Sequence, residues 1–208
     1  MFVKQGPIAG HPIVLNEYLA SRLAHSMGIP VPFGELAALP DDERGWVSAI
    51  VGTEGKPSAP VDVAEAATNE SHIYAGIAAF DVWILNGDRT DENLIWTAEI
   101  GMWAIDHEQA FGAVNPEGTN RLQVLQTTID LSRVYQDAPP DRATMQPWIK
   151  AIWTHGAQWA QVATDAAYRR GLGSKKTMKQ YADFLKFRAE SIFYLVESTH
   201  KWRDDVLI

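Results

Sequence analysis

The sequence predicts an α+β protein with two lobes, a small first lobe that contains most of the strands and a second lobe that is mainly helical. Two observations carry this prediction. In the first 60 residues, short apolar segments bounded by Gly and Pro surround a single helical segment, whereas later segments repeat apolar residues every three or four positions over long stretches. With 208 residues, of which 46% are hydrophobic and 21% charged, the chain can bury a substantial core. We therefore predict one domain, with an N-terminal lobe at residues 1–60 and a helical C-terminal lobe at residues 61–208.

The N-terminal lobe is predicted to begin with a strand and a helix. Residues 2–3 read as the end of a strand, with Lys4 at its edge. Residues 13–27 have the apolar spacing of a helix, and Gly28 is a suitable residue to end it. The rest of the lobe is predicted as an extended segment at 29–39, a strand at 45–52 and a loop or lobe boundary at 52–62.

The C-terminal lobe is predicted to begin with a helix from about residue 69 to residue 85, which has one continuous apolar face. A polar loop follows at residues 86–93, with the sequence NGDRTDEN, and we call it the polar loop below. The segments NLIW (93–96) and GMWAID (101–106) are predicted to form two short strands joined by a turn. Three further helices are predicted at roughly 122–135, 141–168 and 175–203.

Composition excludes several functional classes. The formal net charge of −8 argues against broad attraction to nucleic acid or to an anionic membrane, so neither is an expected partner. The chain has no cysteine, which excludes disulfides and thiolate zinc sites and fits a reducing cytoplasm. No run approaches the roughly 18 apolar residues of a membrane span, and the N-terminus lacks the apolar core of a signal peptide. We expect a cytoplasmic protein.

The polar loop contains the residue types that phosphoryl transfer requires. Asp88 precedes Asn93 by five positions, so one tight loop can direct both side chains at the same phosphate. The predicted hairpin then returns the chain, which would bring Asp106 beside Asn93. An Asn and an Asp that meet in this way offer the hard oxygen ligands that suit Mg²⁺.

Two residues of the N-terminal lobe complete this set. Lys4 ends a strand, and Glu17 lies in the first turn of the next helix, which is the geometry for an ion pair between strand and helix. Taken alone, the polar loop could instead be a capped helix–strand junction, because Asp and Asn favour such turns. The order of Lys4, Glu17 and Asp106 around it favours a functional site.

These residues make the chain resemble a HipA-like kinase, in the broad group that includes the phosphatidylinositol kinases. The resemblance rests on residues 3–4, 16–32, 80–96 and 104–112, and it covers about the first 112 residues. It implies a two-lobed protein-kinase-like fold with a reduced N-terminal lobe. It also implies an ATP- and Mg²⁺-dependent phosphotransferase whose acceptor is a hydroxyl of a protein or of a small molecule. Toxin–antitoxin roles are known in this family.

The resemblance also implies roles for individual residues. Asp88 would be the catalytic aspartate, with Arg89 supporting its loop as the second catalytic-loop residue. Lys4 would contact the nucleotide phosphates, with Glu17 orienting it. Asn93 and Asp106 would bind the metal ion, and the backbone of residues 48–52 would face the adenine base.

The sequence departs from the family pattern at two places. Related kinases carry strands and a Gly- or Ser-containing phosphate loop before the lysine, whereas the lysine here is residue 4. Either the N-terminal lobe is shortened, or another chain or segment covers the phosphates, such as a small partner protein, or the start is wrongly placed. In addition, Thr90 stands where related kinases often have His. A kinase fold that binds a nucleotide or a partner without phosphoryl transfer is therefore the alternative function.

Two further features have simpler explanations. His107 is expected to pack or to form a hydrogen bond beside the metal-binding residues rather than to bind metal. The basic segment at residues 169–179 is expected to be a solvated turn between helices, with docking of an acidic partner or RNA as the alternative.

Overall fold

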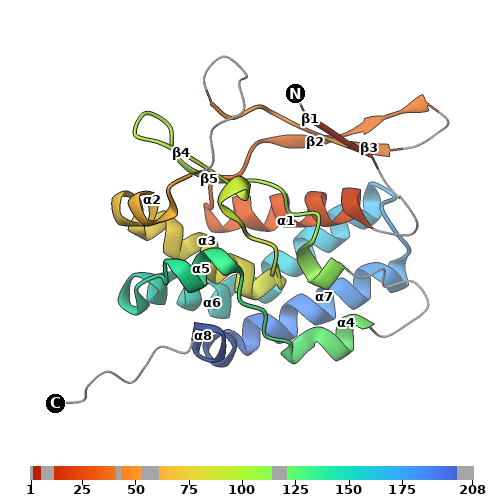
Figure 1. The fold of residues 1–208 in the computed structure, drawn as a ribbon. Helices are drawn as coiled ribbons and strands as arrows, with labels where there is room; N and C mark the ends of the chain where they lie inside the picture. Colours follow the sequence, from red (N-terminus) through yellow and green to blue (C-terminus); the bar gives the residue numbers. More distant parts are fainter. Residues whose placement is uncertain (1, 6–11, 41–43, 53–60, 114–120, 201–208) are drawn as a thin grey trace.

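The structure, a computed structural model, describes residues 2–5, 12–40, 44–52, 61–113 and 121–200, and it has the predicted two-lobed α+β architecture (Figure 1). The N-terminal lobe contains an antiparallel sheet in the order β1-β3-β2. Its strands are β1 (Phe2–Gln5), β2 (Gly34–Ala38) and β3 (Arg44–Ser48). Lys4 lies opposite Trp46 on the central strand, so the predicted strand with Lys4 near its end is confirmed.

Helix α1 (Ile13–Met27) packs below this sheet and joins it to the C-terminal lobe (Figure 1). Most of its apolar side chains are buried, and Tyr18 contacts Trp46 of β3 edge to face at a centroid distance of 6.2 Å. The helix ends as predicted at Gly28, which has a φ of 79° and donates its N–H to the last carbonyls of the helix. Glycine adopts this left-handed conformation without the steric cost that a side chain brings.

The C-terminal lobe is built around α3 (Ser71–Ile84), which is buried from Tyr74 to Ile84. The longest helix, α6 (Arg142–Arg169), packs against α1, α3 and α7. Asp141 caps its first turn by accepting the Thr144 N–H. The other helices are α2 (Val63–Asn69), α4 (Arg121–Val124), α5 (Arg133–Asp137), α7 (Lys175–Glu190) and α8 (Ile192–His200). None of the described helices combines the length and the apolar character needed to cross a bilayer.

The predicted hairpin is present between the two lobes. It consists of β4 (Leu94–Thr97) and β5 (Gly101–Ala104), paired antiparallel with Leu94 opposite Ala104. The Ala104 N–H donates to the Pro30 carbonyl at 2.9 Å, which fixes the hairpin to the segment after α1. The hairpin therefore brings the polar loop, which precedes β4, and Asp106, which follows β5, together at its open end.

The structure corrects two of the predicted helices and adds one. The segment predicted as a helix at 122–135 divides into α4, a 3₁₀ turn (Leu125–Thr127), an extended stretch and α5. Its carbonyls at 125, 126 and 128 bind the buried Arg188 instead of continuing a helical ladder. The helix predicted at 175–203 breaks at Ser191 between α7 and α8, and residues 201–203 lie outside the described part. Helix α2 begins where a loop was predicted to end, because the Asp62 side chain caps it.

Candidate active site

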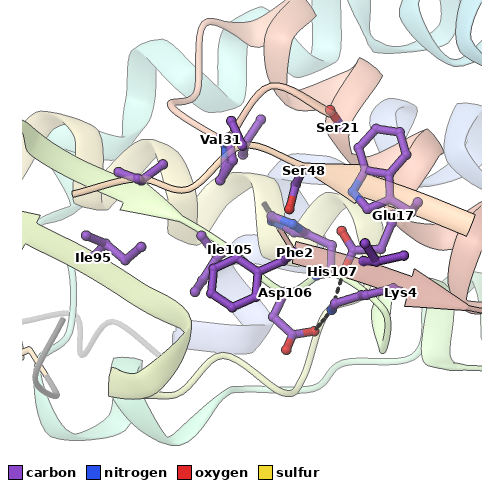
Figure 2. A pocket seen from close by; sticks show the side chains of 15 residues that line it. Phe2, Lys4, Glu17, Ser21, Val31, Ser48, Ile95, Ile105, Asp106 and His107 are labelled. Atoms are coloured by element: carbon purple, nitrogen blue, oxygen red, sulfur yellow. Dashed lines mark hydrogen bonds and ion pairs between the residues drawn. The ribbon is translucent and has the colours of Figure 1, made fainter. Parts of the chain in front are cut away.

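The Lys4 ammonium lies among three carboxylates where the two lobes meet (Figure 2). Its Nζ is 2.7 Å from Glu17 Oε1, 2.5 Å from Asp106 Oδ1 and 3.1 Å from Glu108 Oε2. An ammonium group has three N–H donors, so each of them can be engaged by one carboxylate. The predicted Lys4–Glu17 ion pair is therefore present, and it extends to Asp106 and to Glu108, a residue that sequence reasoning did not single out.

Helix α1 positions the turn that carries Asp106, which comprises residues 106–110 and is called the Asp106 turn below. Glu17 Oε1 accepts the backbone N–H of His107 at 2.9 Å. The neighbouring Asn16, which is fully buried, donates its amide to the carbonyls of Glu108 at 2.8 Å and Ala110 at 3.0 Å. Asp106 itself has a φ of 59°, a left-handed conformation that Asp tolerates better than most residues. The Asp106 turn is thus held from one side by two consecutive residues of α1.

Burial and charge shift the pKa values in this cluster in opposite directions. Burial by itself would lower the pKa of Lys4, but the attraction of Glu17 and the hydrogen bonds to Asp106 and Glu17 outweigh it, so the Lys4 pKa is raised. Burial raises the pKa of Glu17 above its ordinary value although Lys4 opposes this shift. Burial, together with the charges of Arg89 and Lys4, lowers the pKa of His107 well below its ordinary value. His107 is thus a neutral packing residue, edge-on to Phe80 at a ring-centroid distance of 5.9 Å, as expected.

An apolar cavity of about 360 Å³ extends from this cluster between the sheet and the hairpin (Figure 2). Lys4, Glu17 and Asp106 line one part of it, and most of the remaining lining is apolar. The apolar lining residues are Phe2, Val3, Val31, Pro32, Trp46, Ala49, Val51, Ile95 and Ile105. Ser48, Ala49 and Val51 place the segment expected to face an adenine base on this cavity. Its size and its few convergent polar groups are those of a small-molecule site.

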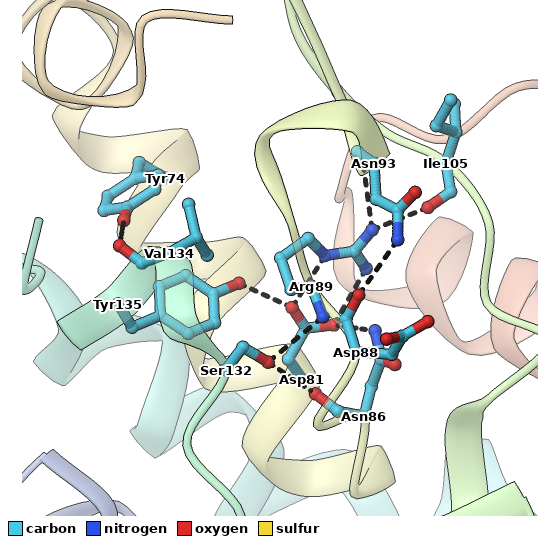
Figure 3. Close-up of polar contacts among 10 residues, drawn as sticks. All are labelled: Tyr74, Asp81, Asn86, Asp88, Arg89, Asn93, Ile105, Ser132, Val134 and Tyr135. Carbon is cyan, nitrogen blue, oxygen red and sulfur yellow. Dashed lines mark hydrogen bonds and ion pairs between the residues drawn. The ribbon is translucent and has the colours of Figure 1, made fainter. Parts of the chain in front are cut away.

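The polar loop is anchored by a buried ion pair (Figure 3). Arg89 is fully buried and donates from Nε and Nη2 to the two oxygens of Asp81, each at 2.9 Å. Its Nη1 donates to the carbonyls of Asn93 at 3.0 Å and Ile105 at 2.6 Å. Tyr135 of α5 donates its hydroxyl to Asp81 at 2.5 Å. Arg89 therefore supports the loop, as predicted, by linking it to α3, to the hairpin and, through Asp81, to α5.

The loop presents Asp88 to solvent and holds Asn93 beside the hairpin. Asp88 is exposed although its neighbour Arg89 is buried. The Asn93 amide donates to the Asp88 carbonyl at 2.9 Å, and the Asn93 carbonyl accepts the N–H of Ile105 at 3.1 Å. The backbone of Asn93 is thus paired with the residue that precedes Asp106. The Asp106 carboxylate itself contacts Lys4, and the metal-binding role of Asn93 and Asp106 stays a prediction.

The oxygen atoms near Asp106 fit the chemistry of a divalent cation. Carboxylate oxygens of Glu17, Asp106 and Glu108 lie within 4.8 Å of one another. Such hard oxygen donors are the ligands that Mg²⁺ prefers. Sequence reasoning gave Asn93 and Asp106 as the ligands, and Glu108 is an additional carboxylate that the structure places in the same group.

The extended segment before α5 closes the polar loop from the other side. The buried Ser132 hydroxyl accepts the Arg89 N–H at 3.2 Å and donates to the Asn86 carbonyl at 3.1 Å (Figure 3). Asp130 packs on Gly87, where an added Cβ would lie 2.0 Å from Asp130 Oδ2. The Ser132 side chain thus bridges Asn86 and Arg89, the residues on either side of Gly87 and Asp88. Neither Ser132 nor Asn16 carries a sequence signal of its role, because each acts on backbone atoms distant in the chain.

The expected solvated turn between helices spans only residues 170–174, because Arg169 ends α6 and the lysines of the segment lie on α7. Arg170 pairs with Glu35 of β2 at 3.0 Å, and Lys179 pairs with Asp183 one turn later on α7 at 2.6 Å. The side chains of both pairs are at least 42% exposed, so their contribution to stability is small.

A solved structure, described as the Shewanella oneidensis MR-1 toxin–antitoxin system HipA, HipB and its operator DNA complex, is similar with a TM-score of 0.49 and 12% identity. The match covers 97% of this chain and 60% of that one, so the chain spans about three fifths of that neighbour's length. A search of functionally curated proteins gives no relative.

The sequence over residues 1–153 matches the family described as HipA-like kinase. The matched range includes the N-terminal sheet, the Lys4 cluster, the polar loop and the hairpin. Because this match covers most of its length, the chain belongs to the HipA-like kinase family.

Proposed function

We propose that this protein is an ATP- and Mg²⁺-dependent phosphotransferase that transfers the terminal phosphoryl group of ATP to a hydroxyl of a protein or of another acceptor. One observation carries the proposal: Lys4, Glu17 and Asp106 meet at an apolar cavity of about 360 Å³. The cavity fits a nucleotide base, and the lysine and the carboxylates lie where its phosphates and their counter-ion would be held.

The residues of this chain would divide the chemistry between them. Lys4, oriented by Glu17, would bind the inner phosphates, and Asn93 and Asp106 would hold Mg²⁺, with Glu108 close by. The metal ion, when bound, neutralises charge on the phosphates. Asp88, exposed at the tip of the polar loop, would orient the acceptor hydroxyl and accept its proton. Arg89 would act only on the position of the loop, because its donors are used by Asp81 and by backbone carbonyls.

The proposal predicts a specific pattern of loss in two variants. Asp88→Asn should lower the rate of phosphoryl transfer by orders of magnitude while ATP binding is retained, because its carboxylate acts on the acceptor. Asp106→Asn should lower both the transfer rate and the Mg²⁺ dependence of ATP binding, because it removes a charged ligand. Transfer from radiolabelled ATP and calorimetric titration with and without Mg²⁺ measure the two quantities.

A matched control separates these effects from a general change of charge. Asp165→Asn removes an exposed carboxylate on α6, whose side chain contacts Gln161, and should leave transfer and binding as in the wild type. Equal turnover by the wild type, Asp88→Asn and Asp106→Asn would refute the assignment.

A kinase fold that binds a nucleotide or a partner without transfer is the second candidate. The observation that favours it is the engagement of Lys4 by three carboxylates, which leaves none of its donors for a phosphate in this state. Mg²⁺-dependent ATP binding without transfer to any acceptor would select this candidate. Transfer that disappears in Asp88→Asn would exclude it.

A small partner protein that completes the N-terminal lobe is part of the proposal, as is a role in a toxin–antitoxin pair. The partner protein is supported by the position of β1, which lies at the edge of the sheet among the described strands, and by its Phe2 and Val3 side chains, which are 60% and 52% exposed. The proposed role in a toxin–antitoxin pair rests only on the family to which the chain belongs. Nucleic acid is not proposed as a partner, because the net charge of −8 disfavours broad attraction to it, and the DNA in the similar structure belongs to that complex. Co-expression with the products of adjacent genes, followed by affinity purification, tests for the partner that completes the N-terminal lobe and for an antitoxin.

A further inference from the structure

A second cavity, of about 400 Å³, lies beside the polar loop. It shares no lining residue with the apolar cavity at Lys4, which we call the nucleotide cavity. We call it the acceptor-side cavity. Thr90 and Asp91 of the polar loop form one wall, and the start of α2 and the face of α5 form the others. Helices α2 and α5 lie on the same side of the molecule (Figure 1). The cavity therefore joins the loop that carries Asp88 to two helices that the nucleotide cavity does not touch.

The chemistry of this cavity is amphipathic. Its apolar part is formed by Val61, Val63 and Val134. Its charged part consists of Asp91, Asp137 and Arg133, so the lining carries two carboxylates and one guanidinium, a net charge of about −1. A ligand that suits it would have an aliphatic portion and a positive charge.

The charged groups are available to a ligand. Arg133 Nε lies 3.6 Å from Asp137 Oδ2, and the two side chains are 89% and 71% exposed, so this pair is weak. Among the described residues, Asp91 forms no ion pair, and it lies at an exposed position. An incoming cation would meet one unpaired carboxylate and one that is loosely paired.

The position of the cavity relates it to the acceptor. Asp91 follows Asp88 by three residues, so their Cα atoms are at most about 11 Å apart. An extended peptide advances about 3.3–3.6 Å per residue. A peptide with its hydroxyl at Asp88 would thus bring a side chain two to four residues away to the acceptor-side cavity.

We propose that the acceptor is a polypeptide and that the acceptor-side cavity binds a lysine or arginine side chain located two to four residues from the phosphorylated hydroxyl. The methylene stem packs on the three valines, and the cationic head reaches Asp91 and Asp137, an arrangement that long basic side chains commonly adopt. The inference rests on the proposed phosphotransferase function, of which it specifies the substrate class.

A binding experiment tests the inference without depending on phosphoryl transfer. The probes are fluorescein-labelled nine-residue peptides with a central serine, in an alanine background, with arginine fixed at one position from two to four residues on either side. Matched peptides carry alanine or glutamate at that position. We expect at least one arginine peptide to bind about tenfold more tightly than its alanine counterpart by fluorescence anisotropy, and this ratio should decrease at high salt.

Two double variants locate the binding. Asp91→Asn with Asp137→Asn should reduce the arginine preference to about twofold or less, because the charges that face the ligand are removed. Asp183→Asn with Glu190→Gln makes the same change in net charge on α7, away from the cavity, and should retain the preference. All four positions are exposed, so both double variants are expected to fold, which circular dichroism checks.

Each result has a defined meaning. Equal binding of arginine and alanine peptides, a preference for glutamate, or an arginine preference that survives Asp91→Asn with Asp137→Asn would each overturn the inference. An arginine preference that depends on Asp91 and Asp137, in a protein that transfers no phosphate, would uphold the cavity and reject the proposed function. Transfer to serine peptides without any preference for a basic residue would uphold the proposed function and reject the acceptor-side cavity as a site for basic side chains.

Discussion

At the scale of single residues, the candidate site depends on side chains that hold backbone segments in place. Asn16 is the clearest case, because its amide nitrogen binds two carbonyls of the Asp106 turn and its oxygen accepts the Tyr181 hydroxyl at 3.2 Å. Helix α7 thus reaches the site through one buried asparagine. Asn16 is a positioning residue, and its effect on the proposed reaction acts through Asp106.

Asn16→Ala should therefore weaken the Mg²⁺ dependence of ATP binding and destabilise the fold by about 2–3 kcal/mol, because buried carbonyls lose their donors. Tyr181→Phe, which removes only the bond to Asn16, should cost about 1 kcal/mol and leave the Mg²⁺ dependence almost unchanged. Urea unfolding and calorimetric ATP titration measure the two effects. If both variants alter Mg²⁺ dependence equally, Asn16 acts through general stability and not through the Asp106 turn.

Arg89 illustrates why a residue of the polar loop can be essential for folding without touching a substrate. Its guanidinium is fully buried against Asp81, and burial, which would lower its pKa, is outweighed by the charge and hydrogen bonds of Asp81, which raise it. Breaking a buried pair leaves one charge uncompensated, at a cost of about 3–5 kcal/mol.

Arg89→Met should accordingly lower the free energy of unfolding by about 3–5 kcal/mol. Arg89→Met combined with Asp81→Leu should recover part of this loss, because the uncompensated carboxylate is also removed, although Tyr135 then loses its acceptor. Urea denaturation of the single and double variants measures both. A double variant that is no more stable than Arg89→Met would contradict this account.

At the scale of elements, the C-terminal lobe is joined by Arg188 of α7. Its guanidinium donates to the carbonyls of Val82 at 2.5 Å and Trp83 at 2.9 Å, near the C-terminal end of α3. The same group binds the carbonyls of the 3₁₀ turn and the extended segment that precedes Ser132. Burial lowers the pKa of Arg188 to about 10, which still leaves it charged at neutral pH. This one side chain therefore satisfies carbonyls near the end of α3 and carbonyls of residues 125–128 that a continued α-helix would otherwise use.

Arg188→Met should destabilise the protein by at least about 3 kcal/mol, since several buried carbonyls would lack donors. Amide hydrogen exchange should increase most at residues 125–132, before the rest of α7 is affected. Lys186→Met, an exposed change on the same helix whose partner Glu190 is 3.8 Å away, serves as the control and should have little effect. A uniform increase in exchange over the whole lobe would contradict a local role for Arg188.

At the scale of the whole molecule, buried histidines make stability depend on pH. Burial lowers the pKa of His200 from 6.5 to about 4, and it also lowers that of His107. In the unfolded chain these histidines gain a proton below about pH 6.5, whereas in the folded chain they stay neutral. The unfolded state then binds more protons, so stability present above pH 6.5 is lost as the pH falls towards about 4. Glu17, with its raised pKa, acts in the opposite direction and offsets part of this loss.

The free energy of unfolding should thus fall between pH 6.5 and 4.5, with His200 contributing up to about 1.4 kcal/mol per pH unit. His200→Gln should flatten this dependence, because the variant side chain does not titrate. His155→Gln, at an exposed position on α6, should leave the dependence as in the wild type. Urea unfolding midpoints at half-unit pH intervals measure this dependence. An unchanged pH dependence of stability in His200→Gln would contradict the role given to burial.

Sequence alone determined the features that depend on neighbours in the chain. The spacing of apolar residues predicted α1, α3, α6 and the hairpin, because periodicity reflects which face of an element is buried. The position of Lys4 on a strand and Glu17 on the next helix predicted their ion pair, which the structure confirms at 2.7 Å. The motifs at residues 3–4, 16–32, 80–96 and 104–112 together indicated the family, which the match over residues 1–153 shows, although the roles of Asp88, Asn93 and Asp106 in chemistry stay predictions.

Only the tertiary structure decided which distant groups meet. No local pattern identifies Asn16, Ser132 or Arg188, because their partners are backbone carbonyls and amides 43 to 106 positions away. The break of the predicted helix at 122–135 has the same origin, since Arg188 takes the carbonyls that a helix would use. The third carboxylate on Lys4, from Glu108, and the cavity between α2, α5 and the polar loop also arise from packing. Local periodicity fixes which elements form, whereas long-range packing fixes the environment of each functional side chain.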